Sequence, residues 1–211
     1  MSFQRARTEE QILIRQNEII KACDLIFTTK GYEEVNFKAI SEITSFTRPT
    51  IYKYYETREE IFLDLLTTEY LNWKDELKNT FDNTESVTKE DYCRLLTNSL
   101  INHKKMLQLL SLHLVEIENN SRLERLVEFK KQVLTVGNVF SDSLNKYFPH
   151  GTEEDKFEFQ MQFFTYIYGL YPYTHHSTKQ IKAMELANIP FTELKFEDFC
   201  YNGLILLISK L

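Results

Sequence analysis

The sequence is poor in glycine and proline, with five glycines and four prolines among 211 residues. Because flexible linkers are usually rich in these two residues, we do not expect a long linker between independent domains. We expect one body, or a small domain joined rigidly to a larger one. Hydrophobic residues make up 43% and aromatic residues 14%, which is enough for a buried core and excludes a disordered chain.

Cysteine is also scarce, and Cys23, Cys93 and Cys200 lie far apart without CxxC or Cys/His ligand spacing. This pattern argues against a disulfide framework and predicts buried, reduced thiols in a cytoplasmic protein. The N-terminal stretch MSFQRARTEEQ has no apolar segment of the kind found in signal peptides. The longest apolar run, LILLI at 204–208, is far below the ~20 residues that span a bilayer. We therefore expect a soluble chain with no membrane partner.

An excess of positive charge is missing as well, since the net charge is −6. This excludes a protein that coats nucleic acid through its overall field, so any contact with DNA must come from a local patch. The window from residue 36 to residue 58 is the part with a net positive charge. It carries Lys38, Arg48, Lys53 and Arg58 against two glutamates.

Signals for catalysis are absent too. The sequence has no glycine-rich phosphate loop and no Ser/His/Asp arrangement that its periodicity would bring together, so we expect no enzyme, no catalytic residue and no cofactor. His113 with Glu116, and the adjacent pair His175 and His176, are the nearest approaches to metal-ligand spacing. Neither pair has a third ligand, so a structural role is favoured over a metal site.

What the sequence does have is helical periodicity over most of its length, without a long alternation of the kind expected of a strand. The spacing of Thr8 and Gln11 predicts a capping box that opens the first helix, and Gly31 ends it. A second capping box, residues 57–60, opens a long helix. The fold class is therefore all-α. Further helices are expected over residues 92–105, 106–118, 121–148, 153–176 and 196–211.

Two short helices precede residue 57. Asn36 is a suitable N-cap for a helix that ends near residue 43, and Thr44-Ser45-Phe46 then breaks the pattern. Thr47 can cap the next helix, in which Pro49 falls in the first turn, where its missing N–H costs no hydrogen bond. A tight turn thus joins two short helices.

The second of these helices has two different faces. Ile51 and Tyr55, four residues apart, share a face that can pack inward, whereas Pro49 and Lys53 lie on the opposite side. A short helix, a three-residue turn and a helix with an outward polar face form the helix-turn-helix arrangement. In it the second helix enters the major groove of DNA.

The segment GYEEVNFKAISEITSFTRPTIYKYYETREEIFLDLL resembles the N-terminal domain of tetracycline-repressor-like (TetR family) regulators. The resemblance covers roughly Asn17 to Leu66. The Gly-Tyr stop, the Ile-Tyr-x-Tyr-Tyr recognition helix and the Arg-Glu-Glu-Ile opening of the next helix fall in register. The turn departs from the usual Ala-Gly-Val of the family and reads Thr44-Ser45-Phe46. This departure affects the expected tilt of the recognition helix.

The resemblance implies a DNA face whose residues have different roles. Arg48 has a forked guanidinium that can reach guanine O6 and N7, Lys38 is a second candidate for guanine, and the two residues after Arg48 could touch a thymine methyl. Lys53, its two tyrosine neighbours and the amide end of the helix that begins at Arg58 suit phosphates. The assigned residues are Lys38, Arg48, Pro49, Thr50, Tyr52, Lys53, Tyr54 and Arg58.

The same resemblance implies a DNA-binding domain over residues 1–60 and a helical ligand-binding and dimerisation domain over residues 61–211. Dimerisation is expected through the last two long helices, and two-fold symmetry then predicts a near-palindromic operator. The helix over residues 153–176 is apolar nearly all round, so it is expected to be buried on both sides. Its two stripes are Phe157, Met161, Phe164, Tyr168 and Tyr171, and Phe159, Phe163, Tyr166, Leu170 and Tyr173.

A small-molecule effector is the third expected partner, and the aromatic excess favours a flat or hydrophobic one. Pro172 is expected to kink its helix and to free a carbonyl near Tyr168. The candidate pocket residues are Ser99, His103, His113, Glu116, Phe129, Gln132, Phe140 and Tyr168.

The leading interpretation is thus a ligand-responsive, homodimeric repressor. The alternative is a module of the same fold that docks a protein partner and does not bind DNA. The altered turn and the lack of a basic N-terminal domain keep it open.

Overall fold

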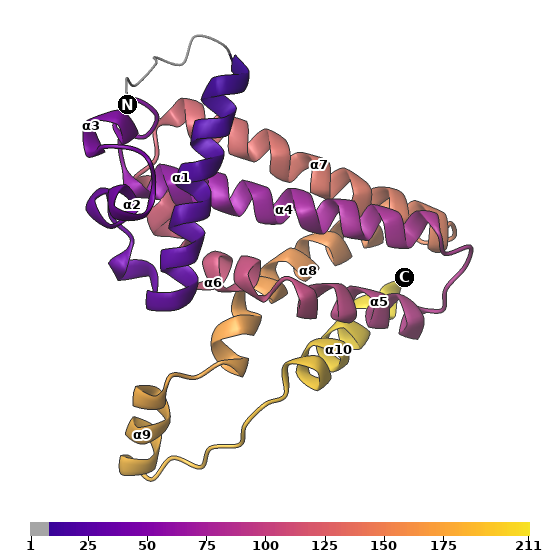
Figure 1. Cartoon of the computed structure of the whole chain (residues 1–211). Helices are drawn as coiled ribbons and strands as arrows, with labels where there is room; N and C mark the ends of the chain where they lie inside the picture. The colour runs from indigo at the N-terminus through magenta and orange to yellow at the C-terminus, as the bar shows by residue number, and fades with distance from the viewer. Residues whose placement is uncertain (1–8) are drawn as a thin grey trace. The chain divides into compact units, whose positions relative to one another are not determined.

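The structure is a computed structural model that describes residues 9–211. Figure 1 shows the helices in chain order. They are α1 (Glu9–Lys30), α2 (Phe37–Ile43), α3 (Arg48–Ile51), α4 (Arg58–Asp82), α5 (Lys89–Asn102), α6 (Lys104–Asn119), α7 (Leu123–Tyr147), α8 (Glu153–Thr174), α9 (Thr178–Leu186) and α10 (Phe196–Leu207), with short 3-10 helices at Tyr32–Glu34 and Ile208–Lys210.

Two compact units divide these helices. The first unit extends to Thr68 and also includes Val115–Lys130, and the second unit consists of Glu69–Leu114 and Lys131–Leu211. Helices α4, α6 and α7 therefore each contribute residues to both units. The predicted domain boundary at residue 60 stays a prediction.

In the first unit, local signals set the helix ends. The amide of Gly31 donates to the Phe27 carbonyl at 2.9 Å, and Gly31 has a φ of 97°, a conformation that glycine adopts without strain. The side chain of Asn36 accepts a hydrogen bond from the Ala39 amide at 3.0 Å, which confirms it as the N-cap of α2. The predicted capping box at Thr8 lies outside the described residues.

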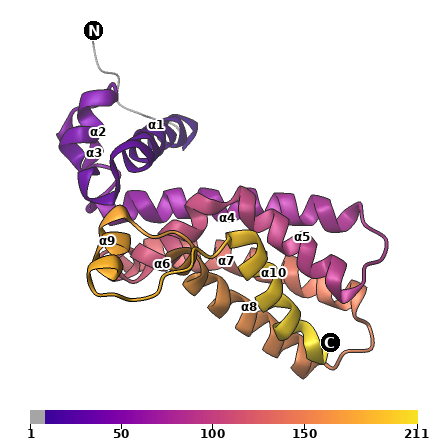
Figure 2. The ribbon, with the colours of Figure 1, turned by 90° about the horizontal axis from the view of Figure 1, so that it is seen from below.

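The second unit has an aromatic core. The Phe140 ring lies 4.6 Å from that of Phe163, and Tyr92 donates or accepts a 2.7 Å hydrogen bond with Ser143. Trp73 is fully buried, and its indole N–H donates to the Ser99 hydroxyl at 2.7 Å. Figure 2 shows α10 beside α5 and α8, the helices against which it packs. The indole, phenol and hydroxyl groups of this core are satisfied, as buried polar groups must be.

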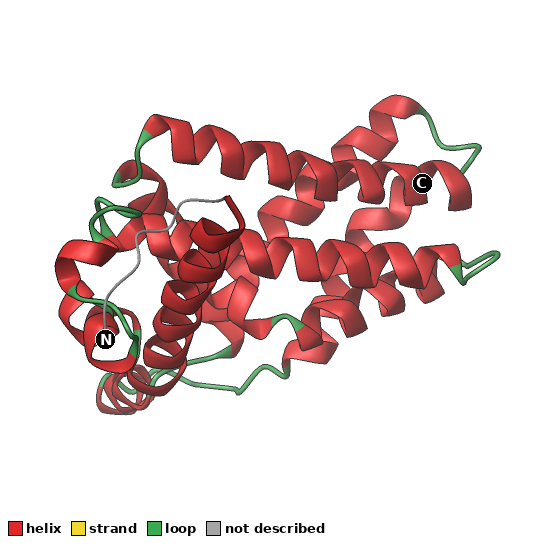
Figure 3. Cartoon of the chain, turned by 45° about the horizontal axis from the view of Figure 1, so that its top comes forward, coloured by secondary structure: helices red, strands yellow, loops and turns green. Residues whose placement is uncertain are grey.

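Figure 3 shows helices joined by loops, with no strand among residues 9–211, so the all-α prediction is confirmed. The boundary expected between residues 105 and 106 lies at His103, because α5 ends at Asn102 and α6 begins at Lys104. Helix α9 is not among the helices predicted from the sequence. Its signal was present, since Ser177 and Gln180 form a capping box with each other.

The aromatic helix α8 does not have two buried faces within the chain. Phe159, Phe163 and Leu170 are buried, as expected of a core stripe, but Phe157 and Met161 of the other stripe are 64% and 42% exposed. Tyr173, which shares its predicted stripe with Phe159 and Phe163, is also exposed. Pro172 lies within α8, as predicted.

The three cysteines are buried and free. Burial raises the pKa of the Cys93 thiol to about 12 and that of the Cys200 thiol to about 11, so both are protonated at neutral pH. Across residues 9–211, no helix is both long and apolar enough to cross a membrane.

Candidate nucleic-acid interface

Helices α2 and α3, with the turn between them, form the predicted helix-turn-helix in the first unit. Helix α3 proper is only one turn long, Arg48–Ile51, and tight turns continue it. The Tyr52 amide donates to the Arg48 carbonyl at 3.0 Å, and the Tyr54 amide donates to Ile51 at 2.9 Å. The recognition side chains therefore project from a short, tightly wound segment, residues 48–55, called the recognition segment below.

The turn that departs from the family pattern is anchored at all three of its residues. The amide and the hydroxyl of Ser45 both donate to the Glu18 carboxylate of α1, at 2.8 and 3.0 Å. The hydroxyl of Thr44 donates to the Ile40 carbonyl at 2.9 Å, and the Phe46 ring is buried. The larger side chains thus fix the turn against α1.

The inward face of the recognition segment agrees with the prediction. Ile51 and Tyr55 are fully buried. The Tyr55 hydroxyl donates to Asp64 at 2.7 Å, and Arg125 forms an ion pair with the same carboxylate at 2.5 Å. Burial, followed by the neighbouring Asp64 charge, raises the pKa of Tyr55 above its ordinary value, so the phenol stays a neutral donor.

The outward face carries most of the predicted DNA-contact residues. Arg48, Pro49 and Lys53 are exposed, and the Tyr52 ring is 59% exposed while its edge meets the buried Phe37 ring at 4.5 Å. Lys38 of α2 is also exposed and has only a loose 3.9 Å ion pair with Glu42. A pair this exposed contributes little, so the Lys38 ammonium can reach a phosphate or a base. Tyr54 is half-buried.

Thr50 is placed differently from the prediction. Its side chain is only 9% exposed, and its hydroxyl lies 3.0 Å from that of Thr47. The one-turn helix draws this hydroxyl back toward its own N-terminus. A contact between Thr50 and a thymine methyl is therefore disfavoured in this conformation.

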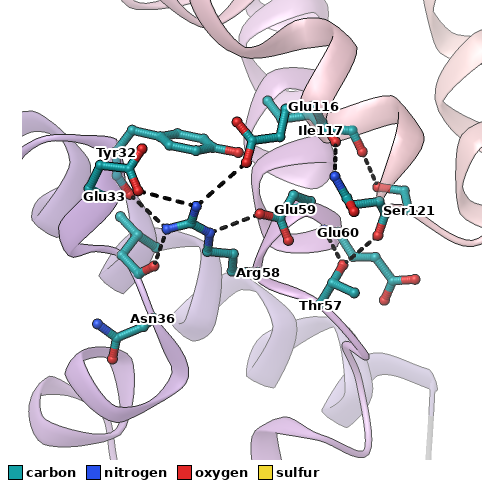
Figure 4. A network of polar contacts seen from close by, with 12 residues as sticks. Tyr32, Glu33, Asn36, Thr57, Arg58, Glu59, Glu60, Glu116, Ile117 and Ser121 are labelled. Carbon is teal, nitrogen blue, oxygen red and sulfur yellow. Dashed lines mark hydrogen bonds and ion pairs between the residues drawn. The ribbon is translucent and has the colours of Figure 1, made fainter.

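The Arg58 side chain is half-buried in the first unit, and Figure 4 shows it among Tyr32, Glu33, Glu59 and Glu116. Its guanidinium stacks on the Tyr32 ring at 4.7 Å and pairs with Glu59 at 2.8 Å. Looser ion pairs reach Glu33 at 3.5 Å and Glu116 at 3.7 Å. Glu33 and Glu116 lie 25 and 58 residues away in the sequence, so no local pattern could predict these ion pairs. The pairs speak against the predicted place of the Arg58 side chain on the DNA face.

A second polar cluster joins the start of α4 to residues 115–130. Glu60 is fully buried, and Arg122 contacts its carboxylate through Nε at 2.6 Å and Nη2 at 3.0 Å. The Thr57 hydroxyl donates to the Asn120 carbonyl at 2.8 Å. Burial alone would raise the pKa of Glu60, but the hydrogen bonds from Arg122 and from backbone amides lower it below its ordinary value.

This cluster modifies the capping box predicted at residues 57–60. The Glu60 amide does donate to the Thr57 hydroxyl, at 3.2 Å. The Glu60 carboxylate, however, accepts from the Glu56 amide at 2.8 Å instead of the Thr57 amide. Arg122 contacts both oxygens of this carboxylate, with Nε on Oε1 and Nη2 on Oε2, the oxygen that also accepts from the Glu56 amide.

The eight predicted effector residues are spread over both units. Glu116 and Phe129 belong to the first unit and the other six to the second. The Ser99 hydroxyl accepts a hydrogen bond from the Trp73 indole, and His103 pairs with Glu76 at 3.0 Å. Phe140 is part of the aromatic core. The assignment of these residues to a ligand stays a prediction.

The remaining predicted residues lie in varied surroundings. The Tyr168 hydroxyl lies 3.5 Å from that of Tyr70, and Phe129 is buried next to Lys130. His113 and Gln132 are half-buried. Among the described residues, no group of three or more His, Cys, Asp or Glu side chains could hold a metal ion.

Comparison with known proteins gives two family matches. Residues 19–65 match the family described as "Bacterial regulatory proteins, tetR family". Residues 67–209 match the "Tetracyclin repressor-like, C-terminal domain". Together the two matches cover both the helix-turn-helix and the C-terminal helices.

An uncharacterized HTH-type transcriptional regulator of Bacillus subtilis (strain 168), YfiR, is 34% identical over 61 residues. That stretch is 29% of this chain and 30% of the relative, so the similarity is confined to less than a third of each protein.

Solved structures resemble nearly the whole chain. The fatty acid degradation regulator FadR from Bacillus halodurans has a TM-score of 0.58 at 14% identity and covers 92% of this chain and 98% of its own. A TetR/AcrR family regulator from Thermobifida fusca has the same TM-score at 15% identity, covering 93% and 97%. FadR from Bacillus subtilis, in complex with stearoyl-CoA, has a TM-score of 0.52 at 15% identity, covering 92% and 98%. At such identities the likeness concerns the fold.

Proposed function

Because this chain belongs to the TetR family of non-enzymatic, DNA-binding transcriptional regulators, we propose that it is a homodimeric repressor released by a small effector. The observation that carries the proposal is the outward face of the recognition segment, where Arg48, Pro49, Tyr52 and Lys53 are exposed. An acidic chain that presents a guanidinium, an ammonium and a phenol together has a surface suited to a DNA groove.

A homodimer is supported by apolar residues of α8 and α10 that the other described residues leave exposed. Phe157 and Met161 lie on one side of α8, and Leu206 of α10 is 75% exposed. Leu204 of α10 and Ile208, which follows α10, are buried within the chain. Two copies joined through α8 and α10 would present two recognition segments to a near-palindromic operator.

Control by an effector follows from what TetR regulators do, since they bind DNA operators and effector ligands. The stearoyl-CoA bound to the Bacillus subtilis FadR belongs to that protein, and its 15% identity transfers no ligand to this one. For this chain we propose a small hydrophobic or aromatic effector. Such a molecule shifts DNA affinity only as far as it binds one conformation better than the other.

The test is fluorescence anisotropy of the purified full chain with labelled fragments from upstream of its own gene. Titrations at low and moderate salt, with excess non-specific competitor DNA, should give tight, competitor-resistant binding that weakens as salt rises. Footprinting should then reveal two half-sites related by a dyad. Absence of binding both to these fragments and to a random-sequence DNA pool would contradict the proposal and favour the protein-docking alternative.

A further inference from the structure

The second unit contains a cavity that is lined by none of the predicted effector residues. It has a volume of about 550 Å³ and lies between the C-terminal end of α8, Gln108 of α6, and α9 with the loop that follows it. This volume is within the range of roughly 300–1,000 Å³ typical of small-molecule sites. A second cavity of about 400 Å³ adjoins it, and the two share Thr174, His175 and Glu193.

Aromatic rings line much of the first cavity. The Tyr171 and His175 rings are stacked in parallel, with centroids 4.3 Å apart. The His176 ring meets the Phe191 ring edge-on at 5.0 Å. Flat π-surfaces in two orientations are walls against which a planar molecule can stack.

Polar side chains that line the same cavity have hydrogen-bond donors and acceptors that a ligand could use. Among the described residues, neither the Gln108 amide nor the His176 imidazole has a hydrogen-bond partner, although both are half-buried. His175 uses Nδ1 toward Thr174 at 3.0 Å, which leaves Nε2. Gln180 uses its oxygen in the α9 capping box, which leaves its NH₂ group. Half-buried polar groups without partners gain from a ligand that supplies matching donors and acceptors.

The charges of the lining restrict what fits. Of the described residues that line the first cavity, Glu193 is the only Asp, Glu, Lys or Arg, whereas Lys104 and Lys195 line the adjoining cavity. Burial, the largest cause, together with the nearby charges of Lys104 and His176, lowers the pKa of His175, which keeps this imidazole neutral at pH 7. The site therefore suits a neutral molecule with at least one donor for the Glu193 carboxylate.

From this cavity, its stacked rings and its unused polar groups, we propose that the second unit binds a neutral, planar heteroaromatic molecule between the end of α8 and α9. Donors and acceptors on the edge of the molecule would meet Gln108, His176 and Gln180. Helix α9 forms one wall of this site, and none of its residues is buried in the chain alone.

The proposal deepens the effector control proposed above and rests on it only for its consequence at the operator. Binding itself is independent of DNA and can be measured without it. The two claims can therefore fail separately.

The experiment uses lumichrome, a neutral, planar, fluorescent tricycle with imide donors and acceptors, as the probe. Titration of the full chain should quench its fluorescence saturably, with one probe bound per chain. His176→Ala and Gln108→Ala should each weaken binding about tenfold, the value of one lost hydrogen bond or stacking contact of 1.4 kcal/mol. Phe191→Ala removes the opposing ring and should have a similar effect.

Matched controls are His150→Ala and Gln162→Ala, because His150 is exposed and Gln162 pairs with Glu158 on α8, and neither lines the cavity. Both should bind the probe like the wild type, and circular dichroism melting should show all five variants folded. No saturable quenching, or equal affinity in the wild type and the three cavity variants, would overturn the proposal. If the probe binds as expected but leaves operator affinity unchanged, the site is supported and effector control is what fails.

Discussion

At the scale of single residues, the cations predicted to lie on the DNA face fall into two kinds. Arg48 and Lys53 project from the recognition segment without an ion pair among the described residues. Arg58, although equally cationic, is held by Tyr32 and three glutamates. Guanidinium forks read base edges and ammonium groups on flexible stems position phosphates, so the first two should act on DNA in different ways.

Arg48→Ala should reduce sequence preference, with a loss of about 1–3 kcal/mol of discrimination between operator and altered operators. Lys53→Ala should weaken binding to all DNA alike and make the slope of log K against log salt shallower by about one. Anisotropy titrations over a salt series measure both effects. Lys179→Ala, which changes an exposed lysine of α9, is the control and should leave both quantities unchanged. Wild-type behaviour of both recognition variants would refute the assignment of α3 to the groove.

The Glu60 and Arg122 pair is the residue-level feature that ties α7 to α4. Glu60 is buried, so removal of Arg122 leaves a buried carboxyl group that has lost its cation. We expect Arg122→Met to lower the free energy of unfolding by about 2–3 kcal/mol at pH 7, less than for a fully buried pair because Arg122 is 41% exposed.

The pH dependence of this effect has a definite sign. The folded-state pKa of Glu60 is lowered below its unfolded value of about 4.3, so its contribution is present above that pH and is lost as the pH falls through the folded pKa. The difference between wild type and Arg122→Met should therefore shrink from pH 7 toward pH 3.5. Urea unfolding at several pH values measures it. Lys130→Met, which removes a more exposed pair with Glu118, should show a small and less pH-dependent effect.

At the scale of helices, the closest contact between α8 and α10 depends on a glycine. A Cβ atom placed on Gly203 would lie 2.3 Å from the Tyr166 hydroxyl and 2.4 Å from the ring carbon that carries it. The Tyr166 hydroxyl donates to the Phe199 carbonyl of α10 at 2.7 Å, so the ring cannot move away without losing that bond. Tyr166 thus fixes how near α10 approaches α8.

Gly203→Ala should destabilise the fold by roughly 1–3 kcal/mol, the cost of overpacking. Gly169→Ala in α8 is the matched control, because a Cβ there meets nothing within 4 Å, and it should stabilise by roughly 0.5–1 kcal/mol through helix propensity. In a Tyr166→Ala background the cost of Gly203→Ala should disappear. Chemical denaturation of the four variants measures these effects, and additive costs would show that the contact is not the cause.

At the scale of the whole molecule, the uncovered apolar residues of α8 and α10 are the main evidence for a second copy of the chain. Exposed aromatic and aliphatic side chains on neighbouring helices are costly for a monomer in water and typical of an oligomer interface. A DNA-binding protein with two recognition segments also gains affinity from simultaneous contact with two half-sites.

Phe157→Glu combined with Met161→Glu should convert a dimer into a monomer and weaken operator binding. Light scattering after size exclusion should report a fall from twice the chain mass to 25.2 kDa. Leu123→Glu adds a charge at another exposed apolar residue, in the first unit, and should remain dimeric. A wild-type protein that is monomeric at micromolar concentration, or a double variant that stays dimeric, would rule out this interface.

Much of the fold could be predicted because its signals are local. Gly31 ends α1, Asn36 caps α2, and Ile51 with Tyr55 face inward, all from spacing within one or two turns. The missed helix α9 had such a signal in Ser177 and Gln180, but its short length and lack of a buried stripe gave no periodicity to support it.

The sequence by itself determined the all-α class, the helix-turn-helix and its register, because these depend on capping, turn chemistry and helical period over a few residues. Tertiary structure alone decided that Arg58 pairs with Glu116, that Glu60 pairs with Arg122, and that a ring-lined cavity forms at the end of α8. Those features join residues up to 62 positions apart or bring together separate segments. No pattern along the chain records such distances, since they arise when packed helices bring remote side chains within a few ångströms of each other.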